Sequence, residues 1–505
     1  MPTAVGPVRG VVVASGDRRG PDGPDGIDVR VLGLVLPVVL LLASCAAFKT
    51  NQPMHAQIVG ERGYGFVADS VGLSVESAIL AGNGKAIQKR VLTEAFKGFR
   101  PGMVLRIGGN TSDQMFWTSK GESTPSSYRF SATPKAMENL AEVTKQLGWR
   151  VVMGVNLRSR DARRAADMAK HAHSIFGASL TAVAIGNEPN VYYPSNPPFG
   201  TFARDVRDYS NAIREEAPGV RIQAPDSSGH RYDFIWSSAS QFASNQETTP
   251  DIYAAHFYGA QGCSTPTVRP SDLFTEFADD RRDTSLRDIS RAASLANSPK
   301  VVLSEVNSVN CGGIVGTSNR LAGALWMLDF AFDAATRGFD GVYFHGSLTA
   351  CIAYSPICVS DDRKVKKADP FKALTVLNGM ANGMAMLSVV PEDSMDNIRL
   401  YALRGKRSLA FVVINTGESD TDGVDVDAVL PEGQFAELSE LEMVTEDETD
   451  TDGSRLARKT SLRGSVPDLD SECSDGLAGR DAATSARVTS GPASAKIVFL
   501  CELPN

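Results

Sequence analysis

The pattern of hydrophobic and polar positions divides the chain into two regions. Between residues 65 and 384, short apolar runs alternate with longer stretches in which apolar residues recur every three or four positions. The longer stretches, such as 134–147 and 320–335, have the period of amphipathic helices. The apolar runs predict eight strands, at 70–76, 103–109, 150–156, 181–188, 221–225, 251–258, 300–307 and 340–346. Strands and helices that alternate eight times predict an α/β fold, the (β/α)8 or TIM barrel.

The pattern changes near residue 385. The runs 398–403, 408–414 and 495–501 are typical of strands, and no helical period separates them. We therefore expect a second domain over 385–505, built as an all-β sandwich.

The N-terminal region has a different composition. Residues 1–28 show no period, and we expect either disorder or a start codon that was assigned too early. In 29–45, Arg30 precedes an apolar run and then small residues, which is typical of a secretory signal. Leu42-Ala43-Ser44-Cys45 resembles a bacterial lipobox, which implies a lipid on Cys45 and a place in the cell envelope. The alternatives are an uncleaved signal anchor or an ordinary signal cut nearby, and 46–64 reads as a polar tether.

The cysteine count agrees with export. Apart from Cys45 the chain has six cysteines, and an exported protein can oxidise them. Six cysteines allow fifteen connectivities. We favour the three pairs Cys263–Cys311, Cys351–Cys358 and Cys473–Cys501. The sequence contains neither Cys-x-x-Cys nor His-Glu-x-x-His, so we predict no metal site.

Length and charge narrow the function further. A chain of 505 residues is long enough for more than one domain and a large core. Its formal net charge of −8 argues against a nucleic-acid partner.

Two glutamates stand at the carboxyl side of predicted strands. Glu188 ends the fourth strand and is followed by Pro189, while Glu305 lies on the seventh. The carboxyl ends of barrel strands carry the active site in this architecture. Glycoside hydrolysis needs two such acids, one to protonate the leaving oxygen and one to face the anomeric carbon. Either glutamate alone could equally be a surface carboxylate or a member of a buried ion pair.

Four segments carry a family resemblance: 105–113, 184–189, 303–313 and 342–346. Together they resemble glycoside hydrolase family 79, which contains β-glucuronidases and heparanase-like enzymes. The resemblance covers roughly residues 65–505 and implies a barrel followed by a β-sandwich. It also implies retention of configuration, with Glu188 as acid/base and Glu305 as nucleophile, and no cofactor.

The resemblance implies roles for further residues. Asn187 matches an asparagine that bonds the sugar 2-hydroxyl, and Tyr258 matches an aromatic residue that supports the nucleophile. Asp113 and His345 match contacts to sugar hydroxyls, and Glu76 is a weaker candidate for the same role. Tyr258 could instead be a packing residue, and Asp113, His345 and Glu76 could be loop caps or polar core groups with their hydrogen bonds satisfied.

Selectivity for a uronic acid would need donors for its carboxylate. In the resembling family these include glycine N–H groups after the nucleophile and two tyrosines. Gly312, Gly313 and Tyr354 match three of these positions, whereas Asn310 stands where the family has the other tyrosine. Its amide can still donate, but the departure leaves the sugar open.

We predict a retaining exo-β-glycosidase that acts on a glycoside or on an oligo- or polysaccharide, and we favour a β-glucuronidase. The alternatives are a retaining β-glycosidase for another sugar and a non-hydrolytic carbohydrate-binding lipoprotein. The oligomeric state stays open.

Overall fold

The computed structural model describes residues 53–60, 63–193, 200–229, 232–244, 249–263, 267–360, 362–393, 395–446, 453–473 and 480–503. The predicted segments 1–28 and 29–45, with Cys45, lie outside these ranges, as do the first residues of the predicted tether.

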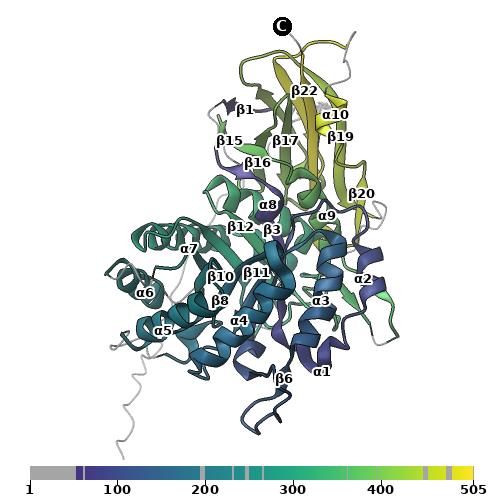
Figure 1. Cartoon of the computed structure of the whole chain (residues 1–505). Helices are drawn as coiled ribbons and strands as arrows, with labels where there is room; N and C mark the ends of the chain where they lie inside the picture. The colour runs from purple at the N-terminus through teal and green to yellow at the C-terminus, as the bar shows by residue number, and fades with distance from the viewer. Residues whose placement is uncertain are drawn as a thin grey trace, which may run out of the picture. The chain divides into compact units, whose positions relative to one another are not determined.

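Eight parallel strands close into a barrel, which confirms the predicted fold (Figure 1). β12 pairs with β3 and thereby joins the last strand to the first. In chain order the strands are β3 (Val71–Glu76), β4 (Val104–Gly108), β7 (Arg150–Val155), β8 (Leu180–Ile185), β9 (Ile222–Ser228), β10 (Ile252–Ala260), β11 (Val301–Val309) and β12 (Gly341–Gly346).

Helices surround the barrel, and α3 is capped at both of its ends. Thr133 accepts a hydrogen bond from the N–H of Ala136 at the start of α3, and Gly148 ends that helix at φ 64°. The helices are α1 (Ala81–Gly84), α2 (Lys89–Ala95), α3 (Pro134–Leu147), α4 (Ala162–Phe176), α5 (Gly200–Glu216), α6 (Tyr232–Ser244), α7 (Glu276–Leu295), α8 (Leu321–Thr336), α9 (Pro370–Met380) and α10 (Leu469–Glu472). Short strands lie in the loops: β5 (Met115–Trp117), β6 (Phe130–Ala132), β13 (Ile357–Val359) and β14 (Val365–Lys367).

A separate, mostly antiparallel sheet forms the second domain, in the order β20-β19-β22-β17-β16-β15-β1-β18-β21. It is folded over its own apolar core as a sandwich, with Leu409, Phe411 and Val413 of β17 inside. The alternate residues of β17 join the core that continues into the barrel. Its strands are β15 (Met384–Pro391), β16 (Ile398–Arg404), β17 (Ser408–Asn415), β18 (Val424–Val429), β19 (Phe435–Thr445), β20 (Thr460–Arg463), β21 (Ser485–Ser490) and β22 (Ser494–Glu502).

The sheet domain also takes strands from the start of the described chain. β1 (Met54–Val59) runs antiparallel to β15 and parallel to β18, and β2 (Gly65–Phe66) pairs with β15. The expectation of a tether over 46–64 is therefore wrong for 54–59. Met54, Ala56 and Ile58 are buried, so this short run alternates as a half-buried strand does.

The three predicted disulfides are present. Cys263–Cys311 joins the loop after β10 to the loop after β11, and Cys351–Cys358 closes the loop after β12. Cys473–Cys501 lies in the sheet domain. Among the described helices, none combines the length and the apolar character that a membrane crossing requires.

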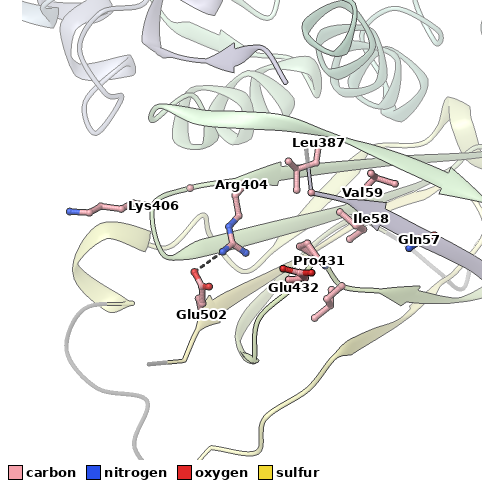
Figure 2. Close-up of a pocket in the computed structure, with 12 residues that line it drawn as sticks. Gln57, Ile58, Val59, Leu387, Arg404, Lys406, Pro431, Glu432 and Glu502 are labelled. Carbon is pink, nitrogen blue, oxygen red and sulfur yellow. Dashed lines mark hydrogen bonds and ion pairs between the residues drawn. The ribbon is translucent and has the colours of Figure 1, made fainter. Parts of the chain in front are cut away.

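A cavity of about 700 Å³ opens in the sheet domain (Figure 2). Arg404 and Glu502, which line it, form an ion pair at 2.6 Å. Ile58, Leu387 and Leu430 also line it. The cavity lies away from the carboxyl ends of the barrel strands, where the candidate glutamates are.

Candidate active site

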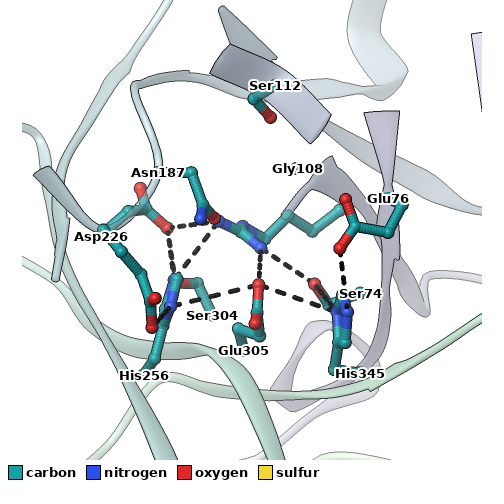
Figure 3. Close-up of polar contacts among 12 residues, drawn as sticks. Ser74, Glu76, Gly108, Ser112, Asn187, Asp226, His256, Ser304, Glu305 and His345 are labelled. Atoms are coloured by element: carbon teal, nitrogen blue, oxygen red, sulfur yellow. Dashed lines mark hydrogen bonds and ion pairs between the residues drawn. The ribbon is translucent and has the colours of Figure 1, made fainter. Parts of the chain in front are cut away.

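Glu305 lies at the centre of a buried polar network at the barrel mouth. Its Oε2 accepts a hydrogen bond from Arg106 Nη1 at 2.9 Å, and its Oε1 accepts one from Tyr258 Oη at 2.9 Å. Figure 3 shows Glu305 between His256 and His345. Burial alone would raise the pKa of Glu305, but the imidazoles of His345 and His256, the charge of Arg106 and the bond from Tyr258 together hold it far below its usual range.

Glu188 follows β8 by three positions and is held in a left-handed conformation, φ 42° and ψ 52°. Few residues other than glycine adopt this backbone, and such strain concentrates at functional sites. Its N–H donates to the carbonyl of Asp226 at 2.8 Å, and the short helix η5 (Pro189–Val191) begins directly after it. The side chain is 19% exposed, and Oε1 lies 3.2 Å from His256 Nδ1.

The two glutamates face each other. One oxygen of Glu188, one oxygen of Glu305 and one nitrogen of His256 all lie within 4.8 Å of one another. Glu188 follows β8, whereas His256 and Glu305 lie on β10 and β11, so the barrel unites positions that are far apart in the sequence. The predicted pair of carboxylates therefore exists as a pair in space.

His256 links the acids. Its Nδ1 faces Glu188 and its Nε2 lies 3.5 Å from Asp226 Oδ1, with the side chain 1% exposed. Burial would lower the pKa of His256, but the charge of Glu305 and hydrogen bonds to Asp226 and Glu188 raise the pKa to about 9. The imidazole is therefore a cation at neutral pH, placed among three carboxylates.

Arg106 is the second buried cation. Its guanidinium has no exposed surface and reaches Asp226 Oδ1 at 3.2 Å as well as Glu305. It also donates to Ser74 Oγ and Asn187 Oδ1, each at 2.9 Å. Asp226 is fixed further by Ser304 and Gln223. Arg106 and His256 thus neutralise the buried carboxylates around them, and either set of charges would be costly to bury without the other.

Asn187, Glu76 and His345 lie around this centre, and their predicted contacts with a sugar stay predictions. Asn187 Nδ2 reaches Asn110 Oδ1 at 3.4 Å. Glu76 accepts hydrogen bonds from the N–H and hydroxyl of Thr111, and His345 Nε2 lies 3.7 Å from Glu76 Oε1. Burial would raise the pKa of Glu76, but His345 and Thr111 lower it. The carboxylate is thus held as an anion.

Asp113 lies farther out, on the short helix η3 (Asn110–Gln114) near the loops after β7 and β8. Its Oδ1 is buried and has no partner among the described residues. Burial raises the pKa of Asp113 to about 7, against the opposing effects of Arg158 and Tyr192. The carboxyl is therefore half protonated near neutral pH.

The residues predicted to meet a uronate follow β11 and β12. Tyr354 N donates to the carbonyl of Gly312 at 3.1 Å, and the Tyr354 ring meets His345 edge to face at 5.7 Å. Gly313 has φ 80°, and a Cβ there would come within 2.8 Å of Tyr354 N, so only glycine fits. This loop is thereby packed closely against the site.

Asn310 is used within the protein. Its Oδ1 accepts from the N–H of Gly262 at 2.6 Å, and its Nδ2 donates to Gln261 Oε1 at 2.7 Å. Both halves of the amide thus tie the loop after β11 to the loop after β10. Its predicted contact with substrate stays a prediction.

Sequence reasoning did not single out Ser74, Arg106, Asp226 and His256. All four are buried, and each interrupts or ends an apolar run of a barrel strand. A charged residue inside such a run was the available signal, because an isolated buried charge needs a partner.

Glu188, His256 and Glu305 have the spacing of a metal cluster. Within the protein, Arg106 and Tyr258 each donate a hydrogen bond to one oxygen of Glu305, and His256 Nδ1 lies 3.2 Å from Glu188 Oε1.

No family model matches the chain. A segment of 227 residues is 23% identical to a β-glucuronidase from Neurospora crassa, and this match spans 41% of the chain but only 40% of the relative's length. The structure resembles a 4-O-α-L-rhamnosyl-β-D-glucuronidase from Fusarium oxysporum 12S, with a TM-score of 0.65 and 16% identity over 88% of this chain and 99% of that one. It also resembles a family 51 arabinofuranosidase from Xanthomonas axonopodis pv. citri, with a TM-score of 0.63 and 13% identity over 89% and 99% of the two chains. These similarities show the barrel fold of glycosidases and are consistent with the resemblance to glycoside hydrolase family 79.

Proposed function

We propose that this chain is a retaining exo-β-glycosidase and that its substrate is a β-glucuronide. The facing pair of Glu188 and Glu305, with one oxygen of each within 4.8 Å of the other, carries the proposal. Carboxyl groups about 5–5.5 Å apart are typical of retaining enzymes, whereas inverting enzymes separate them by about 6.5–9.5 Å to admit a water.

In the first step, a carboxylate oxygen of Glu305 attacks the anomeric carbon while the bond from that carbon to the leaving oxygen breaks. Glu188 gives its proton to the leaving oxygen, so the aglycone departs as an alcohol and the sugar remains as an ester on Glu305. The carboxylate left on Glu188 faces protonated His256 at 3.2 Å, which stabilises the new charge.

In the second step, Glu188 takes a proton from water, and the water oxygen attacks the anomeric carbon. The ester bond breaks, Glu305 leaves as a carboxylate, and the sugar is released with its original configuration. Before the attack, Arg106 and Tyr258 hold the two oxygens of Glu305, which keeps the free nucleophile ionised and oriented.

A uronic acid as the sugar is supported by Gly312, Gly313 and Tyr354 beside the site and by the partial similarity to a β-glucuronidase. A different sugar is the second candidate, because the Asn310 amide is bonded to Gln261 and Gly262.

The test is a panel of 4-nitrophenyl β-D-glycosides. We expect the glucuronide to be hydrolysed in preference to the glucoside, galactoside and xyloside, with the β-anomer as the first product by NMR. Glu305→Gln should abolish turnover, while Glu502→Gln, which alters a carboxylate in the sheet domain, should not. Preference for another glycoside would sink the glucuronide assignment. Sugar binding by the wild type without turnover at any pH would instead support a binding protein.

We also propose that the protein is exported and lipid-anchored through Cys45. The motif before Cys45 and the three disulfides support this, because disulfides persist in oxidising compartments. A bacterial host fed an alkyne fatty acid should label the wild type and not Cys45→Ser. Equal labelling of both, or of neither, would refute the anchor.

A further inference from the structure

Exposed apolar side chains border the barrel mouth. Val191, Phe277, Val315 and Ile352 are 71%, 76%, 76% and 37% exposed. They follow the carboxyl ends of β8, β10, β11 and β12, which is the end that carries the two glutamates. The other large exposed apolar residues of the described chain lie before β3, at the far end of α7 or in the sheet domain. Single exposed apolar side chains are common on protein surfaces, so a ligand site needs a hollow beside one of them.

One of these side chains lines a cleft of about 490 Å³ between the end of β10 and the start of α7. Phe277, Ala278, Val268 and Ala260 supply apolar walls, and Gln261 forms part of the rim. A cavity of this size accommodates a group of small-molecule dimensions.

The charged residues along the cleft are engaged by the protein. Asp272 is paired with Arg269 at 2.9 Å. Arg281 donates to the carbonyl of Tyr258 at 2.7 Å and to that of Gly259. The walls open to a ligand are therefore mainly apolar, and burying an apolar group there would be favourable.

The cleft and the sugar site share a wall. Gln261 lines the cleft, and its Oε1 accepts the hydrogen bond from Asn310, two residues before Gly312. The disulfide Cys263–Cys311 holds the same two loops together. Tyr258, whose carbonyl is held by Arg281 of the cleft, bonds the nucleophile through its hydroxyl. The loops after β10 and β11 are therefore tied together where the cleft adjoins the sugar site.

We propose that this cleft, defined by Ala260, Gln261, Val268, Phe277 and Ala278, holds the apolar aglycone of the substrate. The aglycone is an alkyl or aryl group on the anomeric oxygen. This inference rests on the proposed glycosidase function and adds the leaving-group side, which the residues around Glu305 do not define.

The test is a series of alkyl β-D-glucuronides from methyl to octyl. For wild type, kcat/KM should rise about three- to fourfold for each added methylene until the cleft is filled. Phe277→Ser should flatten this rise and leave the methyl substrate unchanged. Leu295→Ser is the matched control, because Leu295 is an exposed apolar residue, 41% exposed, at the other end of α7. A flat wild-type series, or equal effects of both variants, would overturn the proposal.

A second readout separates the cleft from the chemistry. The fluorescent probe 1-anilinonaphthalene-8-sulfonate should bind wild type, be displaced by octyl but not methyl glucuronide, and bind Phe277→Ser weakly. If no β-glycoside is hydrolysed but octyl glucuronide displaces the probe, the glycosidase function fails and the apolar site stands. If methyl glucuronide is hydrolysed but the octyl compound neither reacts faster nor displaces the probe, the glycosidase stands and the cleft assignment fails.

Discussion

Replacing Arg106 with methionine tests the charge balance of the site. The side chain is fully buried and reaches Glu305 at 2.9 Å and Asp226 at 3.2 Å. Removing it leaves two buried carboxylates without this cation, and breaking one partner from a buried pair costs about 3–5 kcal/mol. For a folded unit of several hundred residues this lowers Tm by roughly 4 °C, measurable by differential scanning calorimetry.

The same change should alter the pH dependence of activity. In wild type the pKa of Glu305 is held far below its usual range, so the nucleophile is ionised across the assay range. Without Arg106 that pKa rises, and a growing share of Glu305 is protonated as pH falls. We expect kcat/KM to drop about 100-fold near pH 5 and less near pH 8, so that an acid limb appears in the profile.

Arg282→Met is the matched control. Arg282 is 11% exposed and pairs with Asp329 and Asp333, away from the two glutamates. It should cost similar stability and leave the acid limb unchanged. If Arg106→Met shows no new acid limb, or if Arg282→Met shows the same one, Arg106 does not act on the nucleophile.

Three further outcomes are expected. Glu188→Ala should slow the hydrolysis of alkyl glucuronides about 10²–10⁴-fold but that of 2,4-dinitrophenyl glucuronide far less, because the dinitrophenolate leaves without a proton. Added azide should restore turnover and give a β-glycosyl azide as product. Equal losses for both leaving groups would exclude Glu188 as the acid. Asp113→Asn should raise the free energy of unfolding at pH 8 by up to about 4 kcal/mol and leave it unchanged at pH 4. The pKa of Asp113 is about 7 in the folded state, so the wild type loses stability as pH rises from about 4 through 7. The same pH dependence of unfolding in both proteins would refute this. The double variant Cys473→Ser, Cys501→Ser should lose about 3 kcal/mol of unfolding free energy, since the disulfide spans a sequence separation of 28 residues. Its kcat/KM should stay unchanged, because the disulfide lies in the sheet domain, far from the two glutamates. An unaltered Tm would argue that the disulfide does not stabilise the fold.

The periodic elements were predictable because local pattern decides them. All eight barrel strands appear near their expected positions, and α3 has the expected bounds of 134 and 147. β1 was missed because six residues with modest alternation do not reveal partners such as β18, more than 350 residues later. Pairing over such a distance depends on the tertiary fold.

The site was predictable in its two acids and less so in what surrounds them. Glu188 and Glu305 were predictable because each lies at the carboxyl side of an apolar run and within a recognisable motif. A charge inside an apolar run signals that Arg106 and Asp226 each need a partner, but only the folded barrel shows that β4 and β9 bring these two together. Asn310 shows the opposite limit of sequence reasoning. It stands where the resembling family has a residue that meets the substrate, but in this structure both its amide oxygen and its amide nitrogen bond the loop after β10.

The place of β1 in the sheet sets an order for assembly. The first described strand lies between β15 and β18, and the first barrel strand, β3, lies against the last, β12. Both pairings join an early segment of the chain to a much later one. Neither domain can therefore close while the ribosome is still making the middle of the chain. The sheet domain can therefore close only after β18 has been synthesised, and a variant cut before β18 would keep the pairing of β1 with β15 but lose its pairing with β18.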